Sequence, residues 1–164
     1  MNLLTGTSVF VTAGLLFAAS PMVACASTLI NVGLWDKGME ATMLTDLAYG
    51  TPGLDLSKAT MGMKLSSASA PAGVLTFRVT NNSNDTVHEM IVIYMADPTK
   101  QLPYIANENR VDEDKAGDKG EVSELDPGKS GSLTVNLKPG SYLLICNVPG
   151  HFAAGMWARF EVTK

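Results

Sequence analysis

One segment near the C-terminus constrains this chain more than any other, because it places three metal-binding side chains at short spacings. An apolar run ends at Cys146, a Pro149–Gly150 turn precedes His151, and Met156 follows a short stretch of small residues. Thiolate, imidazole and thioether groups are all ligands for soft or borderline metal ions. The segment therefore predicts a hairpin whose tip presents three donors of one metal site.

A fourth donor is available upstream. The sequence contains only two histidines, and the other one, His88, begins an apolar strand directly after the polar loop 81–87. One thiolate, two imidazoles and one thioether form the ligand set of a type 1 copper site. A single buried His, Met or Cys is usually a packing residue. The copper prediction depends on the combination and on its spacing.

The first 26 residues have the pattern of an export signal. Residues 9–19 form an apolar core, and the small residues after it end in Ala24-Cys25-Ala26, which fits cleavage after Ala26. The same region also resembles, less well, a bacterial lipoprotein signal that would leave Cys25 as the lipidated residue. We therefore expect residues 1–26 to be the signal and 27–164 the mature domain, in the periplasm or cell envelope, either soluble or lipid-anchored.

Cysteine content fits the copper prediction. The chain has two cysteines, so cleavage or acylation at Cys25 leaves Cys146 as the single thiol in an oxidising compartment. An unprotected thiol there is open to oxidation, and metal ligation protects it.

The remaining sequence indicates one all-β domain. Short apolar runs broken by Gly, Pro and Asn favour strands over long helices, and the length suits a single core. The segment from Asp36 to Lys58 has no clear assignment, although Met39, Met43 and Leu47 have helical spacing. Strands are expected at residues 28–34, 61–65, 73–81, 88–95, 130–137, 140–146 and 156–163.

A polar stretch from Asp97 to Asp126 interrupts the strand pattern. It holds nine acidic and four basic residues, and we expect an exposed acidic loop that includes Asp112, Glu113 and Asp114. The net charge of −4 argues against a nucleic-acid partner, which would require clustered Lys and Arg.

The pattern of His88 followed by Cys-x4-His-x4-Met resembles the cupredoxin family of type 1 blue copper proteins. The loop spacing is most similar to the rusticyanin and sulfocyanin branch, and the likeness spans Met61 to Lys164. This resemblance implies a Greek-key β-sandwich of seven or eight strands. It also implies His88, Cys146 and His151 as equatorial copper ligands and Met156 as the axial ligand.

One position departs from the family pattern. Many cupredoxins place Asn or Ser beside the first histidine, where it helps to tie the two ligand segments together, whereas His88 is flanked by Val87 and Glu89. A carboxylate facing the site would favour Cu(II) over Cu(I) and lower the reduction potential.

The resemblance implies a monomer that passes single electrons between redox partners, such as a cytochrome or an oxidase. We expect the electrons to pass through an exposed His151 edge, with the acidic trio Asp112–Asp114 as a steering rim. The residues expected around that edge are Pro149, Gly150, Phe152, Ala153 and Ala154. An enzyme would need histidines beyond these two for a substrate-binding metal. A copper chaperone or copper-resistance protein is the alternative. The methionines at 39, 43, 61 and 63 are expected to fill the core.

Overall fold

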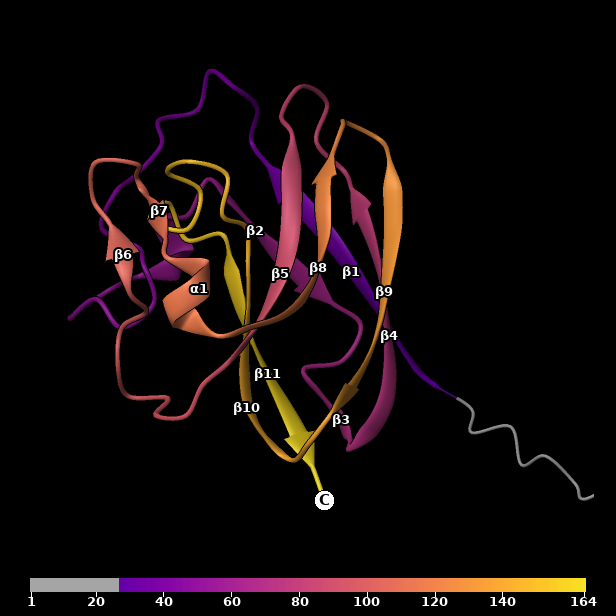
Figure 1. Ribbon diagram of the computed structural model, residues 1–164. Coiled ribbons are helices and arrows are strands. Elements are labelled where there is room, and N and C mark those ends of the chain that lie inside the picture. Colours follow the sequence, from indigo (N-terminus) through magenta and orange to yellow (C-terminus); the bar gives the residue numbers. More distant parts are fainter. Residues whose placement is uncertain (1–26) are drawn as a thin grey trace, which may run out of the picture.

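The structure is a computed structural model that describes residues 27–164 (Figure 1). The expected signal at residues 1–26, with Cys25, lies outside this range. The elements are β1 (Thr28–Asp36), a 3-10 turn η1 (Leu56–Lys58), β2 (Met61–Leu65), β3 (Ser69–Pro71), β4 (Gly73–Asn81), β5 (His88–Tyr94), β6 (Tyr104–Ile105), β7 (Arg110–Val111), α1 (Glu113–Ala116), β8 (Asp118–Leu125), β9 (Ser130–Leu137), β10 (Gly140–Ile145) and β11 (Trp157–Thr163).

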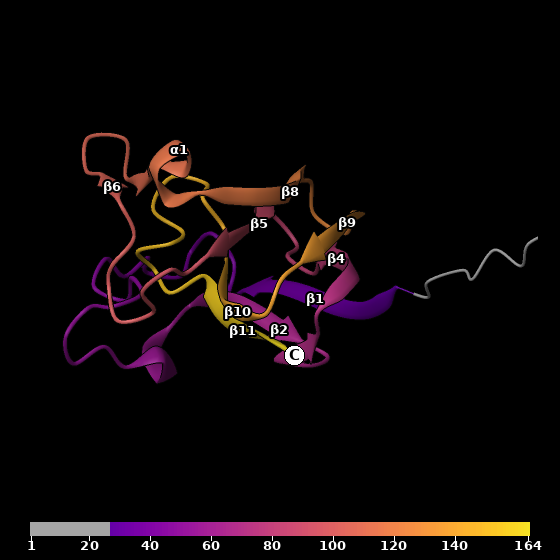
Figure 2. The same ribbon diagram turned by 60° about the horizontal axis from the view of Figure 1, so that its bottom comes forward.

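Two sheets face each other to form a sandwich (Figure 1 and Figure 2). The first has the strand order β2-β1-β4-β9 and the second the order β3-β11-β10-β5-β8, while β6 and β7 form a separate two-stranded ribbon. The pairs β1–β4 and β11–β3 are parallel, and the other pairs are antiparallel. The hairpin after β10 lies at the opposite end of the sandwich from the C-terminus (Figure 1).

The main core lies between the two sheets and follows the alternation of the strands. On β4 the inward residues Leu75, Phe77 and Val79 are fully buried, as period-two alternation requires. Phe77 meets Phe160 of β11 edge to face, with ring centroids 5.3 Å apart. This contact between sheets contributes packing beyond the buried area alone.

Strand β5 is buried on both faces, and this matters for the site. Met90 and Val92 belong to the main core, whereas Ile91 and Ile93 belong to a second apolar cluster on the other face of the sheet. Tyr49 and Trp157 are part of that cluster and pack edge to face with ring centroids 5.0 Å apart. The segment 37–60, which we call the covering segment, therefore packs on the outer face of the second sheet.

The prediction of an all-β sandwich is confirmed, with eleven strands in residues 27–164 instead of seven or eight. The additional strands are short or lie in the acidic stretch. Residues 97–126 are not one loop, because Asp118–Leu125 forms β8 and pairs with β5. Within the described part of the chain, no helix has the length and apolar character needed to cross a membrane.

The methionines fall into two groups. Met61 is buried in the core as expected, but Met39 and Met43 are 72% and 43% exposed. The core prediction is therefore wrong for these two, because the covering segment is irregular at this point and its helical spacing produces no helix.

Candidate metal centre

The local sequence builds a tight hairpin after β10. The backbone N–H of Cys146 donates to the carbonyl of Met156 at 3.0 Å, and the N–H of Met156 donates to the carbonyl of His151 at 3.0 Å. At the tip, His151 donates its N–H to Val148 at 3.0 Å, and Gly150 has a φ of 87°, which disfavours residues with a side chain. These hydrogen bonds therefore fix the backbone positions of Cys146, His151 and Met156.

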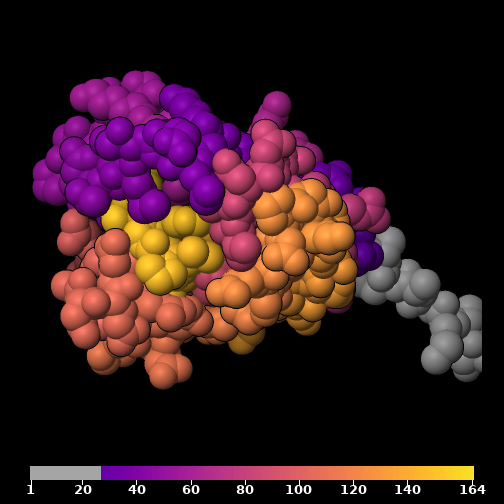
Figure 3. All heavy atoms as spheres, turned by 90° about the horizontal axis from the view of Figure 1, so that it is seen from above, coloured from indigo at the N-terminus to yellow at the C-terminus, as the bar shows by residue number. Residues whose placement is uncertain are grey.

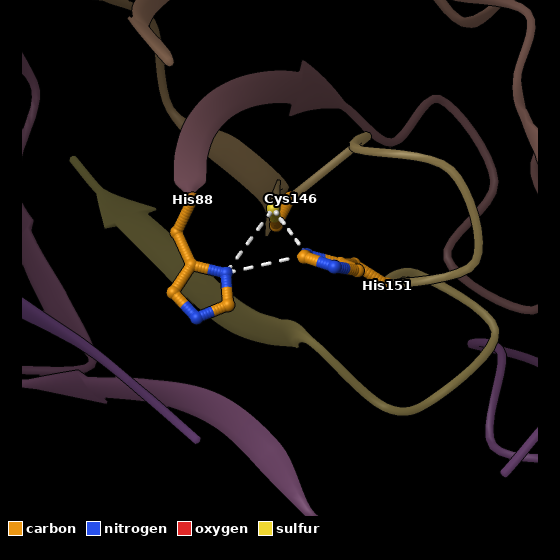
Figure 4. A group of neighbouring side chains, drawn as sticks. All are labelled: His88, Cys146 and His151. Atoms are coloured by element: carbon orange, nitrogen blue, oxygen red, sulfur yellow. Dashed lines mark hydrogen bonds between the residues drawn. The ribbon is translucent and has the colours of Figure 1, made fainter. Parts of the chain in front are cut away.

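Three donor atoms converge inside this hairpin (Figure 4). Nδ1 of His151 lies 3.3 Å from Sγ of Cys146, and Nδ1 of His88 lies 4.0 Å from the same sulfur. The two Nδ1 atoms are 3.2 Å apart. All three side chains are buried. Two residues of the hairpin and one from the start of β5 are therefore brought together as the sequence spacing predicted.

The other ring nitrogen of His88 has its own partner. Nε2 lies 2.6 Å from Oδ2 of Asp36, at the end of β1. Because the carboxylate accepts a hydrogen bond from Nε2–H, the lone pair of Nδ1 is directed toward Cys146 and His151. Asp36 was not among the predicted site residues.

Burial keeps the donor cluster neutral before a metal binds. It raises the pKa of the Cys146 thiol to about 12 and lowers the pKa of His151 to about 4, with the neighbouring His88 adding to the latter shift. Burial also lowers the pKa of His88, although Asp36 acts in the opposite direction. A protonated thiol and two neutral imidazoles therefore form the metal-free state near neutral pH.

Glu89 ties the two ligand segments together. Its backbone N–H donates to Sγ of Cys146 at 3.4 Å, and its Oε1 accepts the N–H of Asn147 at 2.9 Å. Burial raises the pKa of Glu89 to about 7, partly opposed by the hydrogen bond from Asn147 and assisted by nearby glutamates. The carboxylate at this position thus connects β5 to the hairpin, which is the task that Asn or Ser performs in the family pattern.

Asn147 extends the connection to the acidic stretch. Its Oδ1 accepts the N–H of Val111 at 2.6 Å, and its Nδ2 donates to the Val111 carbonyl at 3.0 Å and to Oε1 of Glu113 at 2.6 Å. The sequence analysis missed this residue. Its adjacency to Cys146 was the only available signal, because its partners come from distant segments.

Met156 lies fully buried in the same core cluster as Cys146 and Met90. Its backbone pairs directly with Cys146 and His151. A thioether in this position adds a soft donor to a thiolate and two imidazoles, so the chemistry of the donor set fits copper.

The expected exposure of His151 is wrong. Its side chain is only 4% exposed, and Phe152, Ala153 and Ala154 are also buried. The covering segment packs on this loop, where Leu47 donates its N–H to the Ala153 carbonyl at 2.9 Å.

The surface above the hairpin is a hollow (Figure 3). Hairpin residues, in yellow, lie between the indigo covering segment and the salmon segment around α1. Gly150 donates its N–H to the Asn109 carbonyl at 2.7 Å on the salmon side. Within the hairpin, Pro149 is exposed and Val148 is half-buried, so these two residues are the accessible part of its tip.

The fold is shared with auracyanins and a rusticyanin of known structure. An auracyanin from the photosynthetic bacterium Roseiflexus castenholzii matches with a TM-score of 0.52 at 18% identity, over 85% of this chain and 98% of that one. Auracyanin A from Chloroflexus aurantiacus matches with a TM-score of 0.52 at 22% identity, over 84% of this chain and 100% of that one. Rusticyanin from Thiobacillus ferrooxidans matches with a TM-score of 0.51 at 16% identity, over 84% and 79% of the two chains. The sandwich and the buried Cys-His-His cluster together define a cupredoxin.

The family follows from the sequence match. A model of the sulfocyanin (SoxE) domain matches residues 42–164, which includes all four predicted ligands. The chain belongs to the sulfocyanin family, as the loop spacing indicated. No curated protein matches this sequence.

Proposed function

We propose that this protein is an exported carrier of single electrons that holds one type 1 copper ion. His88, Cys146 and His151 are the equatorial ligands in this proposal, and Met156 is the axial ligand. The observation that carries the proposal is the convergence of Sγ of Cys146 with both Nδ1 atoms, all within 4.8 Å of one another in a buried cluster.

Copper bound here would supply a one-electron Cu(II)/Cu(I) couple. The protein's own residues keep the donors in place in both oxidation states. Glu89 and Asn147 hold the hairpin against β5 and β7, and Asp36 holds the His88 ring. Since these contacts come from packed strands, the donors need little rearrangement when an electron moves.

A copper chaperone or copper-resistance protein is the second candidate function. A chaperone must release its metal to an acceptor, which requires an accessible ligand. Here His151 is only 4% exposed, and Cys146 and His88 are fully buried. The closed site favours retention of the metal through many redox cycles. Catalysis would require a further substrate-binding metal, for which the chain has no histidines beyond these two.

Redox partners would approach the hollow above the hairpin. The accessible residues of the hairpin, Pro149 and Val148, are apolar, and the acidic trio Asp112–Asp114 lies in the segment beside the hairpin. Glu113 is linked to Asn147 of the hairpin by the 2.6 Å hydrogen bond. A small apolar contact with an acidic rim suits a transient encounter with a basic protein, such as a cytochrome or an oxidase subunit.

Export stays part of the proposal on sequence grounds. Residues 1–26 have signal-peptide character, with Cys25 as the alternative lipid-anchoring residue. Intact-mass analysis of the protein from the cell envelope tests this. A chain beginning at Ser27 or at a lipidated Cys25 supports export, and an unprocessed chain in the cytoplasm contradicts it.

The test of carrier against chaperone is repeated redox cycling of the copper-loaded protein in the presence of a competing Cu(I) chelator. We expect one copper ion per chain to be retained through many cycles, with full recovery of the oxidised spectrum. Rapid loss of copper to the chelator after reduction would favour the chaperone.

A further inference from the structure

The contact between Asp36 and His88 joins the two sheets at the metal centre. Asp36 is the last residue of β1 in the first sheet, and His88 is the first residue of β5 in the second. Oδ2 of Asp36 lies 2.6 Å from Nε2 of His88, and the two side chains are 4% and 0% exposed. No strand pairing brings these residues together, because β1 and β5 belong to different sheets.

The Asp36 carboxylate is itself held in place. Its Oδ1 accepts the N–H of Gly38 at 2.6 Å, and Gly38 has a φ of 89° that allows the chain to turn back over the carboxylate. One oxygen is thus anchored to the backbone while the other faces the imidazole, so the carboxylate has a fixed direction.

We propose that Asp36 is a positioning residue for the metal centre, and the proposal rests on His88 being a copper ligand. Asp36 holds the His88 proton on Nε2, so that Nδ1 keeps its lone pair toward Cys146 and His151. Its negative charge makes the imidazole a stronger donor and stabilises Cu(II) relative to Cu(I). Asp36 therefore contributes both to copper affinity and to the reduction potential without touching the metal.

A purely structural role predicts different behaviour. If Asp36 served only to join the sheets, its replacement would lower stability while the ring of His88 and the properties of bound copper stayed the same. Asp85 provides a matched control in the neighbouring loop. It is an exposed carboxylate that accepts the N–H of Met39 at 3.2 Å and does not bond the imidazole.

Two substitutions separate the acceptor from the charge. Asp36→Leu removes the hydrogen-bond acceptor, whereas Asp36→Asn removes the charge and retains an oxygen that can accept from Nε2–H. Asp85→Asn removes a charge of the same sign from the same end of the molecule. All variants are compared as full chains. Each variant must show a cooperative unfolding transition before its other properties are compared.

The first measurement needs no copper. Nitrogen-detected NMR of the metal-free chain reports which ring nitrogen of His88 carries the proton. We expect protonated Nε2 in the wild type, Asp36→Asn and Asp85→Asn, and a mixture of both tautomers in Asp36→Leu. An unchanged tautomer in Asp36→Leu would overturn the positioning role, whether or not copper proves to be the metal.

The second measurement uses copper-loaded protein. We expect Asp36→Leu to weaken Cu(II) binding by about 10- to 100-fold, as for other partners of metal-bound histidines. Asp36→Asn should raise the reduction potential, while Asp85→Asn should raise it less, because Asp85 acts on His88 through its charge alone and does not bond the ring. Equal shifts in Asp36→Asn and Asp85→Asn, or none in either, would overturn the electrostatic part of the proposal. If the wild type binds no copper, the proposed function fails and the tautomer measurement still decides the role of Asp36.

Discussion

The backbone N–H of Glu89 donates to Sγ of Cys146 at 3.4 Å, which links the second residue of β5 to the residue after β10. The side chain of Glu89 completes the link by accepting the N–H of Asn147 at 2.9 Å. One residue thus holds both ends of the donor cluster. Because the carboxylate is buried and lies near other glutamates, its ionised form costs free energy in the folded protein.

That cost makes the stability of the metal-free protein depend on pH in a predictable way. The pKa of Glu89 is raised to about 7, so folding is favoured by this group below its unfolded pKa near 4.5, and the contribution is lost as the pH rises through 7. Glu89→Gln keeps an oxygen acceptor for Asn147 and removes the charge. We expect the variant to match the wild type at pH 4.5 and to exceed it by about 3 kcal/mol at pH 8.

Denaturant unfolding of both metal-free chains at the two pH values checks this prediction. The difference between the chains is the relevant quantity, because the lowered pKa of His151 gives a slope of opposite sign in both. A stability difference that does not change between pH 4.5 and pH 8 would show that Glu89 is ionised as readily as in the unfolded chain.

Metal binding should release one proton per copper ion. Near pH 8 the thiol of Cys146, with a pKa of about 12, is protonated, whereas His151, with a pKa of about 4, is neutral. Ligation requires the thiolate. We therefore expect about one proton released when Cu(I) binds under anaerobic conditions, measured by calorimetry in buffers of different ionisation enthalpy. No release in the wild type would contradict thiolate ligation, and Cys146→Ala should release none.

The axial assignment predicts the effect of Met156→Gln. Replacing a thioether with an oxygen donor favours Cu(II) over Cu(I), so copper should stay bound and the reduction potential should fall. A tenfold change in the ratio of the two affinities corresponds to about 59 mV, and we expect a decrease of at least about that size by voltammetry. An unchanged or higher potential would mean that Met156 is not the axial ligand.

The hollow above the hairpin predicts which substitution slows electron exchange. Pro149 is exposed beside the buried ligand loop, so Pro149→Asp should slow self-exchange by charging the approach surface while the copper spectrum stays unchanged. Ala153 is 5% exposed and its carbonyl is bonded to Leu47. Ala153→Asp should therefore destabilise the fold by about 3 kcal/mol, because it buries a charge. Unchanged self-exchange in Pro149→Asp would exclude this face as the route.

Local features of the sequence were sufficient to predict the sandwich and most of the donor cluster. The alternation of Leu75, Phe77 and Val79 depends only on strand geometry. The placement of Cys146 and His151 depends on a short hairpin within one segment. These features are encoded by neighbouring residues, and the structure reproduces them.

Features that depend on packing between distant segments could not be predicted. Asp36 and His88 meet only because the two sheets stack, and an Asp at the end of a strand is unremarkable as a pattern. The covering segment packs on the ligand loop through contacts such as that of Leu47 with Ala153, and the helical spacing in its sequence did not predict this irregular path. For the same reason Met39 and Met43, despite their helical spacing, do not form a buried helix face.

The optical spectrum of the copper-loaded mature domain, compared with that of Cys146→Ala, tests the central claim most directly. Within residues 27–164, Cys146 is the one cysteine, and it is free, buried and close to both imidazoles. Ligation of Cu(II) by its thiolate predicts an intense visible band in the wild type and none in the variant. A colourless copper complex of the wild type, or a band that survives in Cys146→Ala, would contradict the type 1 copper centre proposed here.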